Sequence, residues 1–246
     1  MPELSPWQWA LAALGGLVTG ISRTGLPGIG TLAVPLFAMA LPPRASTGAL
    51  VPLLVLGDLF AIAWYRRNAV WPHLLRLLPA AGLGVVLGFL ALNRIGDREL
   101  KYVIGALVLA LQAFSLWRGA RAPGELIGAG AFWLAMALGV LAGAATMMAN
   151  AAGPIILVYL LMMRLPKKEF LGTSAWFYFC INLFKLPFSA GLGLITPGSL
   201  LFDLYLAPSV VAGIFIGLLL VRRIQEKTFY IVVQVLTAAS AAKLFF

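Results

Sequence analysis

The chain has 246 residues, of which 62% are hydrophobic and only 11% are charged, and its net charge is +10. A soluble domain carries charge at about a quarter of its positions, so this chain cannot cover itself with a water-compatible surface, and we expect lipid to surround it. Its lysines and arginines cluster in short loops between apolar runs, as the positive-inside rule expects, which excludes nucleic acid as the reason for the charge.

Apolar runs of membrane-spanning length recur along the whole chain. In the first part we expect helices at roughly 7–22 with 31–41, then 45–65, 73–93 and 99–117. In the second part we expect them at roughly 124–142 with 153–163, then 168–189, 199–221 and 228–246. The prediction is an all-α integral membrane protein of about eight transmembrane helices in two four-span halves. The first span of each half, rich in glycine and proline, is expected to be broken or re-entrant.

The two parts of the chain align with each other, which indicates a duplication. The matches recur in the same order with few shifts of register, which chance similarity between apolar sequences does not readily produce. The matched pairs are Gly20/Gly143, Gly30/Gly153, Pro43/Pro166, Gly48/Gly172, Asp58/Asn182, Pro79/Pro208, Gly84/Gly213, Gly88/Gly217 and Arg94/Arg223. We therefore divide one membrane domain into two repeat halves, residues 1–119 and 120–246.

Loop charge allows two interpretations of how the halves are oriented. If each broken segment crosses the membrane once, basic loops concentrate on one side, which is then cytoplasmic, and the repeats are parallel. In that interpretation Arg66 and Arg67 lie on the opposite side from Arg164 and Lys167. If each broken segment is a re-entrant hairpin, each half crosses an odd number of times and the repeats are inverted. The charges of the first half separate better in the parallel interpretation, which we therefore prefer.

The two broken segments, residues 20–31 and 143–154, are the candidate binding site. Interruptions at corresponding places in two halves are the best indication in a sequence of a transporter's substrate site. Short helices that begin near Thr31 and Pro154 would direct free N–H groups at a cavity, an arrangement that binds anions. The alternative is a pair of kinked helices that pack tightly through small residues.

Charged residues inside the predicted spans support an anion site, because an ionisable group there is functional by default. Arg23 and Lys185 would supply positive charge, although Lys185 has the alternative of extending to the membrane interface. Asp58 is the candidate for proton coupling, and its alternative is a structural ion pair with Arg23 or Lys185. Asp203 lies nearer the end of its span and is expected at the interface. The predicted substrate-binding residues are Arg23, Thr24, Gly28, Gly30, Thr31, Thr146, Asn150, Gly153, Asn182 and Lys185.

Catalytic motifs are missing from the sequence. Ser22 does not lie in a Gly-x-Ser-x-Gly motif, and His73 is the only histidine in the chain that could act as its base. No His-Glu-x-x-His motif and no Walker loop occurs. We therefore expect transport rather than catalysis, with no cofactor and no metal. A channel and a membrane-embedded assembly factor are the alternatives. Gly84-x-x-x-Gly88 and its counterpart could pack helices within one chain or in a homodimer.

The sequence resembles the TauE/SafE family of sulfite exporters and sulfonate permeases over nearly its whole length. The resemblance rests on small-residue and proline motifs that recur in both halves. These are Gly28-Ile29-Gly30-Thr31, Val34-Pro35, Pro42-Pro43, Ala45 and Gly48, then Gly153-Pro154, Gly172-Thr173, Asn182, Lys185, Gly213-x-x-x-Gly217 and Arg222-Arg223-Ile224. The resemblance implies transport of small sulfur-containing anions, such as sulfite, sulfonates or sulfoacetate, by a multi-pass protein of the bacterial inner membrane. Arg23 and Pro27 stand where the family usually has smaller residues.

Overall fold

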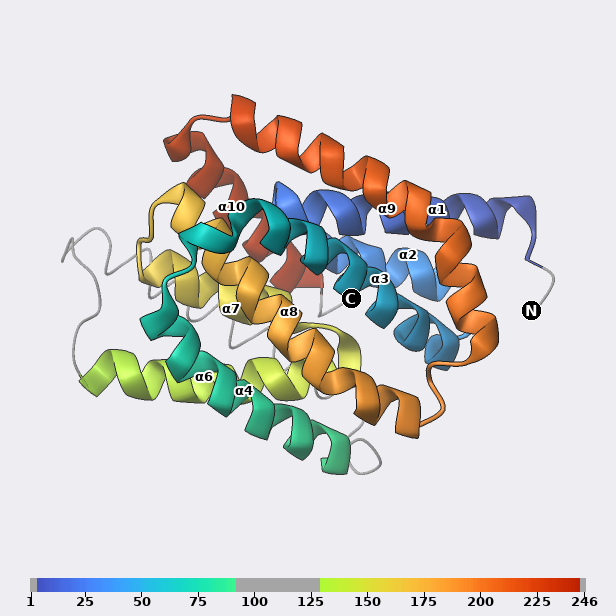
Figure 1. Cartoon of the computed structure of the whole chain (residues 1–246), viewed down its shortest axis with the longest axis horizontal. Helices are drawn as coiled ribbons and strands as arrows, with labels where there is room; N and C mark the ends of the chain where they lie inside the picture. Colours follow the sequence, from blue (N-terminus) through green and yellow to red (C-terminus); the bar gives the residue numbers. More distant parts are fainter. Residues whose placement is uncertain (1–3, 92–128, 244–246) are drawn as a thin grey trace.

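A computed structural model describes residues 4–91 and 129–243 of the chain (Figure 1). Within these ranges the protein is all-α, with 88% of residues in helices and no strand. The helices long and apolar enough to cross a membrane in the described ranges are Ala45–Asn68, Trp71–Ala91, Phe132–Ala149 and Pro197–Arg223. The helix expected at 99–117 and the expected boundary between the halves lie outside the described residues.

The helices follow the expected apolar runs closely. They are α1 (Pro6–Thr24), the short 3₁₀ helix η1 (Ile29–Leu32), α2 (Ala33–Ala40), α3 (Pro43–Tyr65), η2 (Arg66–Asn68), α4 (Trp71–Ala91), α6 (Ala129–Ala149), α7 (Ala152–Met162), α8 (Lys167–Gly191), α9 (Pro197–Arg223) and α10 (Glu226–Lys243). Local chemistry fixes several starts: α1 begins with a Ser5–Gln8 capping box and α9 with a Thr196–Ser199 capping box. In each box a proline directly follows the cap residue, at the first helical position, where its missing N–H is harmless.

α1 and α2 form an antiparallel helical hairpin. Gly15, in the middle of α1, lies against the ring of Phe37, and Gly30 lies against Ser22, so α2 runs back along the second part of α1. The chain reverses in the stretch that ends at Gly28, whose φ of 114° is a conformation that side-chain-bearing residues rarely adopt. α2 has eight residues, about 12 Å of helix, which is too short to cross a bilayer alone.

α6 and α7 form the corresponding hairpin in the second half. The reversal here takes two residues, Asn150 and Ala151, and Asn150 adopts a left-handed φ of 52°, which asparagine tolerates better than most residues. The interruption is much shorter than the predicted 143–154, because α6 continues to Ala149. Its last turns are rich in alanine and methionine, which favour helix. In the first half, α1 likewise continues past Gly20 to Thr24.

Helices that the sequence alignment relates to each other, α1 to α6 and α4 to α9, pack in reciprocal pairs, α1 beside α9 and α6 beside α4, as Figure 1 shows. Gly20 lies against the backbone of Val210, and Gly25 against Gly217, so α1 and α9 run in the same direction. The counterpart pair has the same close contacts, Gly84 with Val140 and Gly88 with Ala144. Small residues therefore bring both pairs of backbones into contact.

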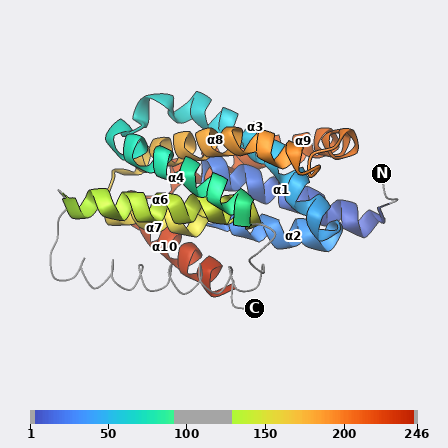
Figure 2. The same cartoon turned by 90° about the horizontal axis from the view of Figure 1, so that it is seen from below.

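Equivalent helices of the two halves run in opposite directions. Tyr65, at the end of α3, donates a hydrogen bond to the carbonyl of Thr24 at the end of α1, so α3 runs with α1. α4 returns after the short η2, and α6 runs with α4. α6 is therefore antiparallel to α1, its counterpart. Figure 2 shows the same helices turned by 90°, with α3 and α10 on opposite faces of the bundle.

The preferred parallel interpretation of the repeats is therefore wrong, and the hairpin interpretation describes the chain. The turns at Gly28 and Asn150 reverse the chain where the parallel interpretation needs it to continue. Arg66 and Arg67 lie at the same end of the bundle as the loop between α7 and α8, since Asn68, the last residue of their 3₁₀ helix, lines one surface pocket with Pro166 and Lys167. The total loop charge favours one side in both interpretations, and the separation of charge within the first half, on which the preference rested, indicated the wrong one.

Labelling of introduced cysteines tests this topology. In a Cys180→Ser background, we expect Arg67→Cys and Gln225→Cys to react with a membrane-impermeant maleimide from the same side of oriented vesicles. Gly191→Cys, at the opposite end of α8, should react only from the other side. Reaction of Arg67→Cys and Gln225→Cys from opposite sides would restore the parallel arrangement.

Candidate functional site

A small cavity lies between the two hairpin turns. Its volume is about 40 Å³, roughly the space of three water molecules. It is lined by Thr19, Ser22, Arg23, Pro27, Gly28, Gly30, Ala33, Val34, Leu50, Leu54, Thr146, Asn150, Ala152, Gly153, Tyr178 and Asn182. Ala152, the first residue of α7, lies in the wall, so the free N–H groups of that helix N-terminus are at the cavity. Ala33, the first residue of α2, lies in the wall as well, but its N–H donates to the carbonyl of Gly30 in the preceding η1.

Arg23 is the charged side chain in the cavity wall. It projects from the last turn of α1, where its side chain is 12% exposed. Its guanidinium lies 3.2 Å from Oδ1 of Asp58 as an ion pair, and its Cζ lies 4.5 Å from the centre of the Tyr178 ring. Stacking on an aromatic face and pairing with a carboxylate hold a guanidinium in one orientation. The arginine is therefore positioned to present its remaining N–H groups to the cavity.

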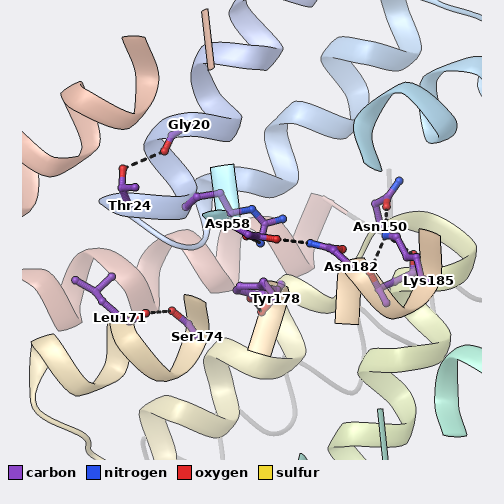
Figure 3. A network of polar contacts seen from close by, with 12 residues as sticks. Gly20, Thr24, Asp58, Asn150, Leu171, Ser174, Tyr178, Asn182 and Lys185 are labelled. Atoms are coloured by element: carbon purple, nitrogen blue, oxygen red, sulfur yellow. Dashed lines mark hydrogen bonds and ion pairs between the residues drawn. The ribbon is translucent and has the colours of Figure 1, made fainter. Parts of the chain in front are cut away.

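Asp58 and Asn182, which occupy equivalent positions in the two halves, are in direct contact (Figure 3). Asn182 donates a hydrogen bond of 2.7 Å to Oδ2 of Asp58, and both side chains are buried. The pairing of Asp58 with Arg23 favours the structural of its two predicted roles, while its proposed part in proton coupling stays a prediction.

Lys185 is buried on α8 and is enclosed by oxygen atoms. Its Nζ donates to the carbonyl oxygen and Oγ1 of Thr146, at 3.3 and 3.1 Å, and to Oδ1 of Asn150 at 2.5 Å (Figure 3). The side chain is only 1% exposed, so the alternative that it extends to the interface is wrong. Lys185 does not line the cavity. It holds Thr146 and Asn150, which do, and it stabilises the turn between α6 and α7.

The structure brings most of the predicted binding residues together, and sets a few apart. Those in the cavity wall are Arg23, Gly28, Gly30, Thr146, Asn150, Gly153 and Asn182. Thr24 instead faces α9, where its hydroxyl donates to the carbonyl of Ile214 at 2.9 Å. The side chain of Thr31 lies outside the described part of the structure.

Two features escaped the sequence analysis. Tyr178 lines the cavity, stacks with Arg23, and donates from its hydroxyl to the carbonyl of Gly153 at 3.4 Å. It lies one turn before Asn182 on α8, and this helical spacing could have identified it. Asp203, expected at the interface, is 5% exposed instead, because α9 packs this part of its surface against neighbouring helices.

Comparison with known protein families decides what kind of molecule this is. The family described as sulfite exporter TauE/SafE matches residues 11–244, nearly the whole chain. The chain belongs to the TauE/SafE family. TauE/SafE proteins are membrane transporters, and the apolar helices of this chain agree with that assignment. Comparison with curated proteins and with solved structures gave no match.

For this TauE/SafE chain, we expect Lys185→Met to weaken anion binding although Lys185 does not line the cavity. Methionine keeps most of the side-chain volume but leaves Asn150 and Thr146 without their donor, which costs about 1–3 kcal/mol. Anion affinity measured by thermal shift should fall about tenfold or more as these residues leave their positions. The φ of Asn150 is left-handed, a conformation that glycine adopts easily and valine rarely does. Asn150→Gly should therefore retain more stability than Asn150→Val. Unchanged affinity in Lys185→Met would contradict a positioning role.

Proposed function

We propose that this TauE/SafE protein is a secondary transporter that carries a small sulfur oxyanion across the bacterial cytoplasmic membrane. The observation that carries the proposal is the cavity between the two hairpin turns, which combines the Arg23 guanidinium with the N-terminus of α7 and the turn before α2. These groups attract negative charge from several directions. The sequence offers no nucleotide-binding loop, so an existing gradient must supply the driving force.

The size of the cavity favours the smallest members of the substrate class. A volume of about 40 Å³ suits an anion of few heavy atoms, such as sulfite, better than a long sulfonate. The polar side chains around it, among them Ser22, Thr146, Asn150 and Asn182, supply hydroxyl and amide groups for oxyanion oxygens. Longer sulfonates require the hairpins to separate.

We assign the end of the bundle that carries Arg66, Arg67 and the loops before α8 and α10 to the cytoplasm. The loop before α8 contains Arg164 and its helix opens with Lys167 and Lys168, while Arg222, Arg223 and Lys227 flank the loop before α10. Basic residues in short loops remain on the cytoplasmic side. The duplicated hairpins then approach the cavity from opposite sides of the membrane, the usual arrangement of inverted-repeat carriers.

Uptake into proteoliposomes tests the proposal. We expect saturable uptake of radiolabelled sulfite, accelerated by unlabelled sulfite inside the vesicles, and competition by methanesulfonate more strongly than by sulfoacetate, sulfate or acetate. Flux that rises with concentration without saturation and shows no acceleration would indicate a channel. Uptake no faster than in protein-free liposomes with every anion would contradict transport.

A further inference from the structure

Asp203 on α9 is a buried carboxylate without a partner. Its side chain is 5% exposed, and neither of its oxygens has a hydrogen-bond partner in the described part of the structure. The other buried charged side chains are well partnered: Asp58 pairs with Arg23 and Asn182, and Lys185 donates to three oxygen atoms. An ionised carboxylate without compensation is strongly disfavoured in such a place. Asp203 therefore needs a ligand that the described residues do not provide.

The described surroundings of Asp203 supply no charge to neutralise it. The neighbouring Phe202 packs against Trp9 and Phe37, with ring centres 5.2 and 6.4 Å apart. α9 packs on α1 and α3, whose described charged side chains are Arg23 and Asp58, and these two pair with each other. Among the described side chains of those helices, Tyr65 is the remaining titratable group, and it donates to the carbonyl of Thr24 at the other end of α1. No counter-ion for Asp203 comes from these helices in the described residues.

A proton is the ligand that a single carboxylate can bind. A metal cation requires several oxygen ligands, and the described residues contain no group of three or more histidine, cysteine, aspartate or glutamate side chains. A proton needs one oxygen, and it removes the charge that burial disfavours. The position of Asp203 in the second turn of α9 places it at the end of the bundle opposite the basic loops.

α9 connects this carboxylate with α1, the helix that carries Arg23. Beyond Asp203, α9 contacts α1 through Gly20 and Val210, and the Thr24 hydroxyl donates to the carbonyl of Ile214. Pro208 lies between Asp203 and these contacts and leaves one backbone carbonyl of the helix without its usual donor. A change of charge at Asp203 can thus alter how the first part of α9 packs on α1, next to the anion cavity.

We propose that Asp203 is a proton-binding site, open to the extracytoplasmic side, that couples anion movement to the pH gradient. This proposal rests on the proposed transport function. Protonated Asp203 is neutral and stable inside the bundle, and its deprotonation favours an arrangement in which α9 exposes it to water. Coupling then belongs to Asp203, while Asp58 holds the arginine of the anion site.

Flux measurements on two conservative variants test the coupling. The probe is methanesulfonate, a strong-acid anion whose charge does not change with pH. We expect Asp203→Asn to keep methanesulfonate exchange without a pH gradient within about threefold of the wild type but to lose accumulation driven by a pH gradient. Asp203→Glu, which keeps a titratable group, should retain accumulation. Asp58→Asn should lower exchange and accumulation together, because Arg23 loses its ionic partner.

Infrared difference spectroscopy tests proton binding independently of transport. The wild type should show a protonated-carboxyl band that titrates with pH, and the band should disappear in Asp203→Asn and persist in Asp58→Asn. Full pH-driven accumulation in Asp203→Asn with the band unchanged would overturn the proposal, as would loss of exchange and accumulation together. If the wild type transports no anion, the proposed function fails, and the infrared band alone decides whether Asp203 binds a proton.

Discussion

Replacement of Arg23 by glutamine is expected to abolish saturable sulfite uptake and to destabilise the protein. The guanidinium is the charged group in the described cavity wall, and hydrogen bonds to charged groups contribute about 1.5–3 kcal/mol each. Loss of two such bonds lowers anion affinity by about 100-fold or more. The substitution also leaves Asp58 buried without its cation, a change that typically costs about 3–5 kcal/mol. Uptake into proteoliposomes and thermal unfolding in detergent measure the two effects.

The double variant Arg23→Gln with Asp58→Asn separates binding from stability. Removal of both charges leaves no unpaired ion, so most of the lost stability should return, whereas sulfite uptake should stay at the background level. Recovery of uptake in the double variant would show that the arginine serves the fold and not the anion. If the double variant loses as much stability as Arg23→Gln, the single substitution does not act by disrupting the ion pair.

Substitution of Gly20 or Gly143 by valine is expected to disrupt the fold to a similar degree at both positions. A Cβ atom at Gly20 would overlap the carbonyl oxygen of Val210, and one at Gly143 would overlap that of Ala81. Backbone atoms cannot move aside as flexible side chains can, so the paired helices must separate, at a cost of about 1–3 kcal/mol or more. The melting temperature should fall by about 5–10 °C.

Gly191 provides the matched control for this experiment. It lies at the end of α8, where an added Cβ atom would meet no other described atom within 4 Å, so Gly191→Val should change the melting temperature little. A fall at only one of Gly20 and Gly143 would mean that the two helix pairs do not contribute equally to the bundle.

Much of the fold follows from the sequence because hydrophobic length and repeated glycines report directly on helices and their contacts. The expected run at 73–93 corresponds to α4 at Trp71–Ala91, and Gly84 and Gly88 lie at the close helix contact that their spacing indicates. Chain direction was harder to predict. It depends on whether a few residues around Gly28 and Asn150 bend the chain or reverse it, and backbone conformation at a turn leaves only a weak trace in composition.

The candidate site was predictable in its residue types but not in their partners. Glycine-rich interruptions and buried cations identified Arg23, Asn150 and Gly153 before any geometry was known. Whether Lys185 faces the cavity or supports its wall depends on side-chain direction along α8, which the sequence does not specify. The burial of Asp203 likewise follows from the packing of α9 on α1 and α3, a long-range contact that apolar periodicity cannot assign.

The contact between Asp58 and Asn182 restricts how the two halves can diverge. The alignment of the two parts of the sequence pairs these positions, and in the structure they lie against each other. Two ionised aspartates there would place like charges in contact without water between them, so one must be neutral. Asparagine in one copy meets that requirement permanently and frees the other carboxylate to hold Arg23. The two aligned positions thus need different residues where they meet, and the described cation in the cavity wall comes from the first hairpin alone.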